Sequence, residues 1–170
     1  MLRVGLIGYG AWGSHHARVI AGNANLVAIA ARSAETAARA HAAHPSCQVF
    51  TDYRSLLDTP LDAVVVVLPS HLHHEMSKAV LESGRHLLLE KPMTLSLVHC
   101  DELIALARAK CRVLALGHEM RLSSLWAKAQ EIVAAGAIGE PLYLLVELWR
   151  RPYRLGADGW RYDISRVGNW

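Results

Sequence analysis

Val4-Gly-Leu-Ile-Gly8-Tyr-Gly10-Ala-Trp-Gly13-Ser-His-His-Ala-Arg-Val-Ile-Ala21 is the stretch that decides the fold. Its apolar start, residues 4–7, predicts a strand buried on both faces, and residues 14–21 have helical composition. The glycines between them follow the spacing G-x-G-x-x-G. In this spacing the first glycine allows a tight turn, the second lets the backbone approach a pyrophosphate, and the third lets the helix pack closely on the strand. We therefore predict a dinucleotide-binding turn with the phosphates at the positive end of the helix.

A glycine-rich turn can also be purely structural, and this alternative remains open from the spacing alone. The position of the turn between a strand and a helix, with a second apolar run at residues 26–31, favours nucleotide binding. Two histidines follow the last glycine, and we expect one of them near the phosphates and the other on the surface. The candidate cofactor contacts in the turn are Gly8, Tyr9, Gly10, Ala11, Trp12 and Gly13.

The bulk composition is that of an ordinary globular chain. Its 170 residues can bury one substantial core, or one domain with part of another. A formal charge of +3 without a Lys/Arg cluster argues against nucleic-acid binding. The apolar runs are too short to span a bilayer, and the chain begins directly with a strand, so we expect no signal peptide and a cytoplasmic protein.

The three cysteines are odd in number and lack C-x-x-C spacing. A disulfide framework or a zinc site is therefore not expected, and Cys47, Cys100 and Cys111 are interpreted as buried reduced thiols. His71, His73 and His74 lie close together, but no carboxylate/histidine set with recognised metal spacing accompanies them, so we predict no metal site.

Strands alternate with helices along the chain. Further strands are expected at residues 48–50, 62–68, 86–89 and 112–116, and helices at residues 34–44, 51–58, 70–83, 97–109 and 123–135. Residues 62–68 are strongly β-branched without polar alternation, which is typical of a central parallel strand covered on both sides. The predicted fold class is therefore α/β, a doubly wound parallel sheet of the Rossmann type.

The pattern changes after Gly136. Residues 139–141 resemble a linker, residues 142–149 predict a longer strand, and residues 150–170 are loop-like and rich in Arg, Gly and aromatics. We predict a nucleotide-binding domain over residues 1–121. Residues 122–170 are then a connecting helix and the truncated start of a second α+β domain, because too little chain follows to complete one.

The end of the second strand bears on the choice of nucleotide. NAD-preferring domains place a carboxylate about 20 positions beyond the glycines, where this chain has Arg32 and Ser33. A guanidinium suits a ribose 2′-phosphate, which favours NADP over NAD. The alternative is that Arg32 is a solvated charge and Ser33 only caps a helix.

Glu90-Lys91-Pro92 follows a predicted central strand at the edge where open α/β sheets bind ligands. The Lys91 ammonium there could hydrogen-bond the substrate oxygen whose charge changes during hydride transfer, or relay its proton. A helix-capping salt bridge with Pro92 as a simple helix breaker explains the same triplet without chemistry.

Taken in order, six motifs make the chain resemble the Gfo/Idh/MocA oxidoreductases over its whole length. These motifs are Gly8-Tyr-Gly-Ala-Trp-Gly13, Thr51-Asp-Tyr-Arg-Ser-Leu-Leu57, Pro69-Ser-His-Leu-His73, Glu90-Lys-Pro92, Gly117-His-Glu-Met-Arg121 and Gly136-Ala-Ile-Gly139. The resemblance implies a hydride transfer between NAD(P) and a sugar, polyol or related hydroxyl compound in a homo-oligomeric enzyme.

The resemblance also implies residue roles. Lys91 matches the catalytic lysine beside the nicotinamide, and Glu90 and Pro92 shape its loop, where the peptide before the proline is often cis. The cofactor loop along the nicotinamide ribose corresponds to Pro69, Ser70 and His73. The residues entering the substrate cleft correspond to His118, Arg121, Trp160 and Arg161.

Members of this family continue into a domain whose sheet forms the substrate pocket and the oligomer interface. Its acidic residue and histidine, the proton-transfer pair of the lysine, would fall just beyond Trp170. The chain is therefore expected to be a truncated or split member. A non-catalytic nucleotide-binding sensor or regulatory fragment is the alternative. We also expect self-association through residues 142–149, or disorder beyond about residue 140.

Overall fold

The computed structural model of the chain describes residues 1–149 and 157–168. Six parallel strands form one sheet in the order β3-β2-β1-β4-β5-β6. The strands are β1 (Arg3–Ile7), β2 (Asn25–Ala30), β3 (Gln48–Phe50), β4 (Ala63–Val66), β5 (His86–Leu89) and β6 (Leu114–Leu116). The predicted doubly wound α/β fold is confirmed.

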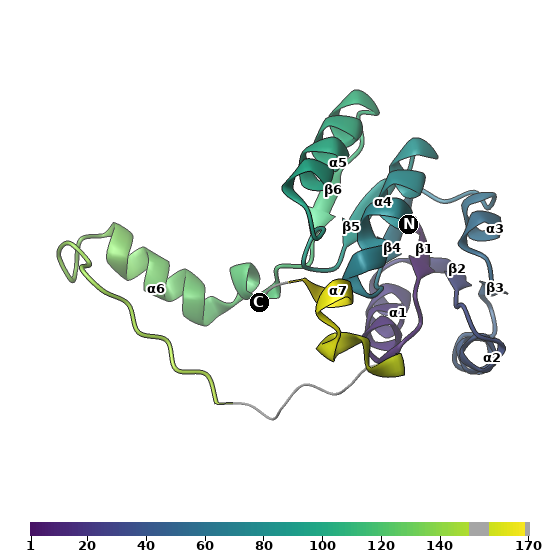
Figure 1. Ribbon diagram of the computed structural model, residues 1–170, viewed down its shortest axis with the longest axis horizontal. Coiled ribbons are helices and arrows are strands. Elements are labelled where there is room, and N and C mark those ends of the chain that lie inside the picture. The colour runs from purple at the N-terminus through teal and green to yellow at the C-terminus, as the bar shows by residue number, and fades with distance from the viewer. Residues whose placement is uncertain (150–156, 169–170) are drawn as a thin grey trace. The chain divides into compact units, whose positions relative to one another are not determined.

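Helices connect the strands and follow the last of them (Figure 1). The α-helices are α1 (Ala11–Asn23), α2 (Ala34–Ala43), α3 (Tyr53–Leu57), α4 (His73–Glu82), α5 (Leu97–Ala109), α6 (Ser124–Ala134) and α7 (Ile164–Val167). The short 3-10 helices are η1 (Ser70–Leu72), η2 (Glu119–Leu122) and η3 (Ala157–Tyr162). None of the helices in the described part of the chain is long and apolar enough to cross a membrane.

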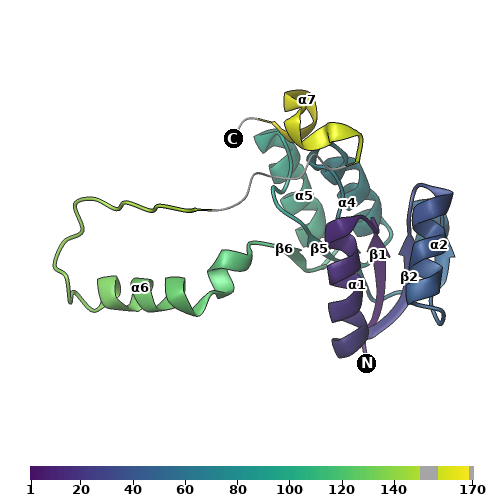
Figure 2. The same ribbon diagram turned by 90° about the horizontal axis from the view of Figure 1, so that it is seen from below.

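The two faces of the sheet carry separate cores, because side chains alternate along each strand. On β4, Val64 and Val66 pack in the cluster that includes the α4 and α5 side chains, whereas Val65 packs with the α1 and α2 side chains. Both faces are therefore covered by helices, which Figure 2 shows from a second direction. This double coverage explains the continuous apolar runs of the central strands.

The chain forms two compact units, residues 1–117 with 155–170, and residues 118–154. The predicted strand at residues 142–149 is wrong: the backbone there has no strand pairing with the described residues, and its side chains are exposed. An extended apolar segment becomes a strand only when a neighbouring strand pairs with its backbone groups.

The last predicted loop, residues 150–170, lies partly outside the described residues. Its described part contains η3 and α7 instead of continuous loop. The side chain of Asp163 caps α7 by accepting a hydrogen bond from the Ser165 amide at 3.0 Å, which explains a helix where composition indicated none.

The cysteines are free, but only Cys47 is buried, and Cys111 is exposed after the end of α5, contrary to expectation.

Candidate functional site

The glycine turn between β1 and α1 is shaped by two glycines that no other residue could replace without movement. Gly8 has φ +98°, and a Cβ atom there would collide with the carbonyl oxygen of Val67. A Cβ at Gly13 would collide with the carbonyl oxygen of Gly8, which lies beneath the first turn of α1. The tight turn and the close packing of helix on strand are therefore both present.

The middle glycine is different, because a Cβ at Gly10 would meet no atom within 4 Å. Gly10 is the N-cap of α1, and no side chain forms a cap hydrogen bond there. Ala11 begins the helix and is exposed, whereas the Tyr9 ring turns into the core against His44. Open space beside free helix N–H groups suits an anionic ligand, which fits the pyrophosphate of a dinucleotide.

Lys91 lies at the carboxyl end of β5, two strands from the glycine turn in the order β1-β4-β5. The Lys91–Pro92 peptide is cis, as the resemblance implied. Lys91 is exposed, and among residues 1–149 and 157–168 its ammonium group has no hydrogen bond or ion pair. Lys91 therefore forms no salt bridge with the described residues, whereas Glu90 of the same triplet pairs with His16 of α1 at 2.8 Å.

Glu90 turns its carboxylate back toward α1 and is only 12% exposed. Its Oε1 accepts hydrogen bonds from Trp12 Nε1 and His16 Nε2, each at 2.8 Å. Burial raises the pKa of Glu90, but the hydrogen bonds from His16 and Trp12 outweigh burial and hold that pKa below its ordinary value. Glu90 is thus an ionised link between the glycine-turn helix and the strand that carries Lys91.

His73 is fully buried and is a second link to the same loop. Its Nδ1 lies 2.6 Å from the carbonyl oxygen of Pro92, and its Nε2 lies 2.8 Å from that of Leu68. Burial lowers the pKa of His73, against the effect of these two carbonyl groups. Both ring nitrogens face backbone carbonyl oxygens, and a neutral imidazole donates a hydrogen bond to one of them. The side chain of His73 therefore lies between the two loops and is not exposed.

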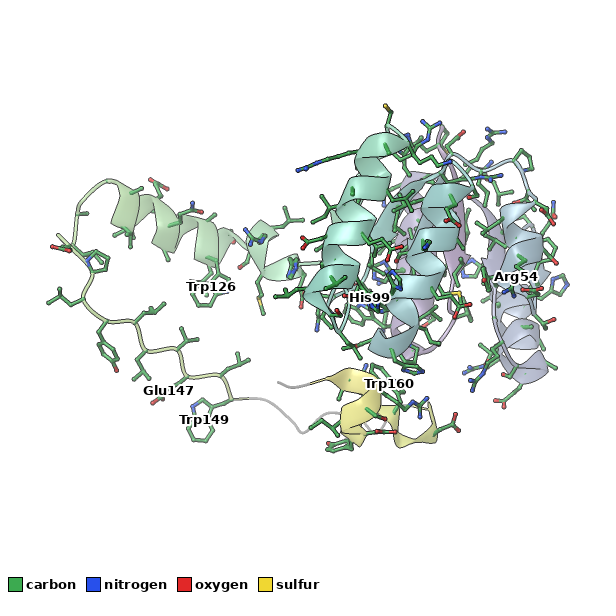
Figure 3. The ribbon with its side chains drawn as sticks, turned by 45° about the horizontal axis from the view of Figure 1, so that its top comes forward. Arg54, His99, Trp126, Glu147, Trp149 and Trp160 are labelled. Atoms are coloured by element: carbon green, nitrogen blue, oxygen red, sulfur yellow. The ribbon has the colours of Figure 1, made fainter. Side chains whose placement is uncertain are left out.

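The loop after β4 carries the other predicted ribose contacts. Pro69 precedes η1, and Ser70 is its first residue and is buried. Helix α7 packs against η1, within the same unit. Trp160 lies in η3 (Figure 3). The central carbon of the Arg161 guanidinium is 5.5 Å from the centroid of the Trp160 ring.

The carboxyl end of β2 carries the predicted 2′-phosphate contacts. Arg32 is 82% exposed and pairs with Asp158 of η3 at 3.3 Å. Ser33 caps α2: its Oγ accepts a hydrogen bond from the Thr36 amide at 3.2 Å and donates one to Thr36 Oγ1 at 2.8 Å. The capping alternative for Ser33 is therefore realised, whereas Arg32 is not merely solvated.

The other two predicted substrate residues belong to the second unit. His118 is the N-cap of η2 and Arg121 lies within it, and both are exposed. No group of three or more His, Cys, Asp or Glu side chains that could hold a metal ion occurs among the described residues.

His16 and Asp158 contact predicted site residues, Glu90 and Arg32, but were not themselves predicted as site residues. His16 follows Trp12 by four positions, which puts both side chains on one face of a helix. This spacing could have predicted that the two side chains share a partner. Asp158 lies 126 positions from Arg32 along the chain, so no local pattern could connect them.

Comparisons with known proteins agree with this geometry. Residues 2–118 match the Gfo/Idh/MocA family, described as an oxidoreductase family with an NAD-binding Rossmann fold. The uncharacterized oxidoreductase YdgJ of Escherichia coli is 33% identical over 96% of this chain and 50% of its own length. UDP-N-acetylglucosamine 3-dehydrogenase of Acidithiobacillus ferrooxidans is 34% identical over 86% of this chain and 45% of its own length.

Among solved structures, scyllo-inositol dehydrogenase from Lactobacillus casei with bound NAD(H) and scyllo-inositol is similar with a TM-score of 0.77 and 26% identity. The similarity covers 82% of this chain and 43% of that one. The chain thus spans about half the length of the curated relatives it matches. By its ordered motifs, its sheet and these matches, the chain belongs to the Gfo/Idh/MocA family of oxidoreductases.

Proposed function

We propose that the protein is an NAD(P)-dependent oxidoreductase that transfers a hydride between the nicotinamide and a sugar, polyol or related hydroxyl compound. The observation that carries the proposal is that the open space beside Gly10, at the start of α1, and an exposed lysine, Lys91, both follow the carboxyl ends of parallel strands of one sheet. The relatives named for UDP-N-acetylglucosamine and for scyllo-inositol support the substrate class.

The residues of the glycine turn fit a dinucleotide. The N–H groups of the first turn of α1 hold the pyrophosphate, and Gly10 leaves the space it needs. Pro69 and Ser70, in the loop after β4, would contact the nicotinamide ribose. When bound, the cofactor supplies the hydride donor or acceptor. Glu90 contributes by fixing the loop that faces the cofactor, since its carboxylate is occupied by α1.

Lys91 is the catalytic residue of the proposal. Its ammonium donates a hydrogen bond to the substrate oxygen, which stabilises negative charge as a hydroxyl becomes a carbonyl or the reverse. In the reducing direction the ammonium gives a proton to the carbonyl oxygen that becomes the hydroxyl, and in the oxidising direction the neutral amine of Lys91 takes the hydroxyl proton. Positioned acid–base help of this kind typically contributes about 10²–10⁴-fold to the rate. His118, Arg121, Trp160 and Arg161 contact the substrate in this proposal.

The proposal favours NADP over NAD through Arg32. The Arg32 guanidinium would hold the 2′-phosphate of NADP in place of the Asp158 carboxylate, with which it pairs in the structure. Because both side chains are largely exposed, their ion pair is weak. Competition from Asp158 therefore lowers the affinity of the protein for NADPH by less than about fivefold. Arg32→Gln is expected to weaken NADPH binding and spare NADH, and Asp158→Asn to strengthen NADPH binding by up to that factor.

The wider organisation belongs to the same proposal. In this proposal residues 1–121 form the dinucleotide-binding domain and residues 122–170 begin a substrate and oligomerisation domain of a homo-oligomer, although residues 155–170 group with residues 1–117 in the structure. The three free cysteines favour a reducing, cytoplasmic location.

The test is a thermal-unfolding series of the full chain with NADPH, NADH and no ligand at matched concentrations. A ligand at 100 times its Kd stabilises by about 2.7 kcal/mol, which raises the Tm of a chain of this size by roughly 5–10 °C. Stabilisation by either nucleotide supports the proposal, and a larger shift with NADPH supports the Arg32 assignment. No shift with either nucleotide contradicts it.

A further inference from the structure

Glu90 is the point at which the helix of the glycine turn contacts the loop of Lys91. Three donors converge on its carboxylate: Trp12 Nε1 and His16 Nε2 on Oε1, and the Lys91 backbone N–H on Oε2 at 3.2 Å. The carboxylate also lies against Gly117, where an added Cβ would be 3.0 Å from Oε1. The group therefore has little room to adopt another orientation.

These hydrogen bonds are important for Glu90 because its carboxylate is buried from solvent. The Glu90 carboxylate is only 12% exposed and has lost most of its hydration, so it depends on the donors that replace water. If one donor is removed, the remaining charge is left short of partners and the carboxylate turns toward solvent. Because the Lys91 amide donates to the same carboxylate, that movement carries the backbone of Lys91 with it.

The opposite flank of Lys91 is held independently. His73, from α4, lies with Nδ1 2.6 Å from the Pro92 carbonyl oxygen. The backbone on both sides of Lys91 is thus fixed to helices, while its ammonium group remains exposed. The backbone of Lys91 is thus rigid while its ammonium group stays accessible to a ligand, as preorganised sites require.

We propose that Trp12 and His16 are positioning residues for Lys91, acting through the Glu90 carboxylate, so that the helix that begins at the glycine turn sets the location of the reactive ammonium. The inference rests on the proposed function only in taking Lys91 as the reactive residue. Trp12 lies between Gly10 and Gly13, so the same short segment that offers open space at Gly10 also holds Glu90.

The experiment compares full-length variants by ¹⁵N relaxation of the Lys91 amide without ligand. His16→Leu removes the donor and His16→Gln restores an N–H donor of similar reach. Arg18→Leu changes an exposed residue of the same helix as a control, since His15 packs against Trp12. Trp12→Phe keeps an aromatic ring and removes the indole N–H. Thermal unfolding of each variant, with the amides of β1 and β4, reports whether the sheet is intact.

An order parameter of about 0.85 is expected for Lys91 in the wild type, Arg18→Leu and His16→Gln, and below about 0.6 in His16→Leu. Trp12→Phe is expected to lower it as well. Unchanged order at Lys91 in both His16→Leu and Trp12→Phe overturns the inference, as does a loss of order spread equally over β1 and β4. If the Lys91 pattern is as expected but neither NADH nor NADPH binds the wild type, the proposed function fails while the positioning of Lys91 stands.

Discussion

Gly10→Ala and Gly13→Ala differ by one methyl group from the wild type and are expected to separate binding from folding. At Gly13 the new Cβ collides with the Gly8 carbonyl oxygen and lies 2.9 Å from the Gly8 carbonyl carbon. Both atoms are backbone and cannot rotate away. At Gly10 the new Cβ meets no atom within 4 Å, and φ −75° with ψ −167° is an ordinary conformation for alanine.

The expected magnitudes follow from these surroundings. Overpacking against a fixed neighbour costs about 1–3 kcal/mol, which lowers the Tm of a chain of this size by roughly 2–12 °C for Gly13→Ala. For Gly10→Ala, the weaker N-cap preference of alanine, about 0.5–1 kcal/mol, is offset by a gain of about 0.4–1 kcal/mol from the stiffer unfolded chain. Its Tm is therefore expected within about 2 °C of the wild type.

Binding is expected to show the opposite sensitivity. The methyl group of Gly10→Ala occupies space that the pyrophosphate needs, so NADH and NADPH affinity falls at least about tenfold, or ~1.4 kcal/mol. Calorimetric titration of both nucleotides, together with thermal unfolding without ligand, gives the two quantities for each variant. Wild-type affinity in Gly10→Ala, or wild-type stability in Gly13→Ala, would refute the reading of this turn.

Three further changes test other parts of the chain. The Asp62 carboxylate accepts hydrogen bonds from the guanidinium and the backbone N–H of Arg3, which hold the pKa of Asp62 at about 2, against 3.8 for a free aspartate. The ion pair therefore stabilises the fold above about pH 4, and this stability is lost as the pH falls toward 2. Asp62→Asn is expected to flatten that part of the stability–pH curve, and an unchanged slope argues against the assignment. Cys111 is exposed, whereas Cys47 is buried and its thiol donates a hydrogen bond to the Leu26 carbonyl oxygen at 2.9 Å. Burial also raises the pKa of Cys47, which lowers the reactivity of its thiol. An aromatic disulfide reagent is therefore expected to label Cys111 first, and equal labelling rates count against the fold around Cys47. Leu144 is 78% exposed in the apolar segment 142–149, so Leu144→Lys is expected to reduce concentration-dependent self-association in sedimentation velocity, and a monomeric wild type refutes this.

Most of the Rossmann sheet could be predicted because its signals are local. The unbroken apolar run of residues 63–68 can be buried only between two helical layers, and the glycine spacing ties the first strand to its helix. The position of Lys91 at the carboxyl end of a strand follows from the alternation of strands and helices alone. For these elements, local pattern and tertiary structure agree.

What could not be predicted depends on contacts between distant residues. Nothing near Glu90 in the sequence indicates that its carboxylate turns toward Trp12, 78 positions earlier. His73 looked like a cofactor contact by its motif, yet it is buried between two carbonyl groups. Residues 142–149 have strand composition, but composition does not supply the neighbour that a strand needs.

The measurement that tests the central claim most directly is an intermolecular NOE from bound NADH to Lys91. Reductive ¹³C-methylation labels the four lysines, at positions 78, 91, 110 and 128, and Lys91→Arg assigns the signal of interest. We predict NOEs from the nicotinamide H4 protons to the methyl groups of Lys91 and to those of no other lysine. Bound NADH whose nicotinamide contacts a different lysine, or none, would contradict the account.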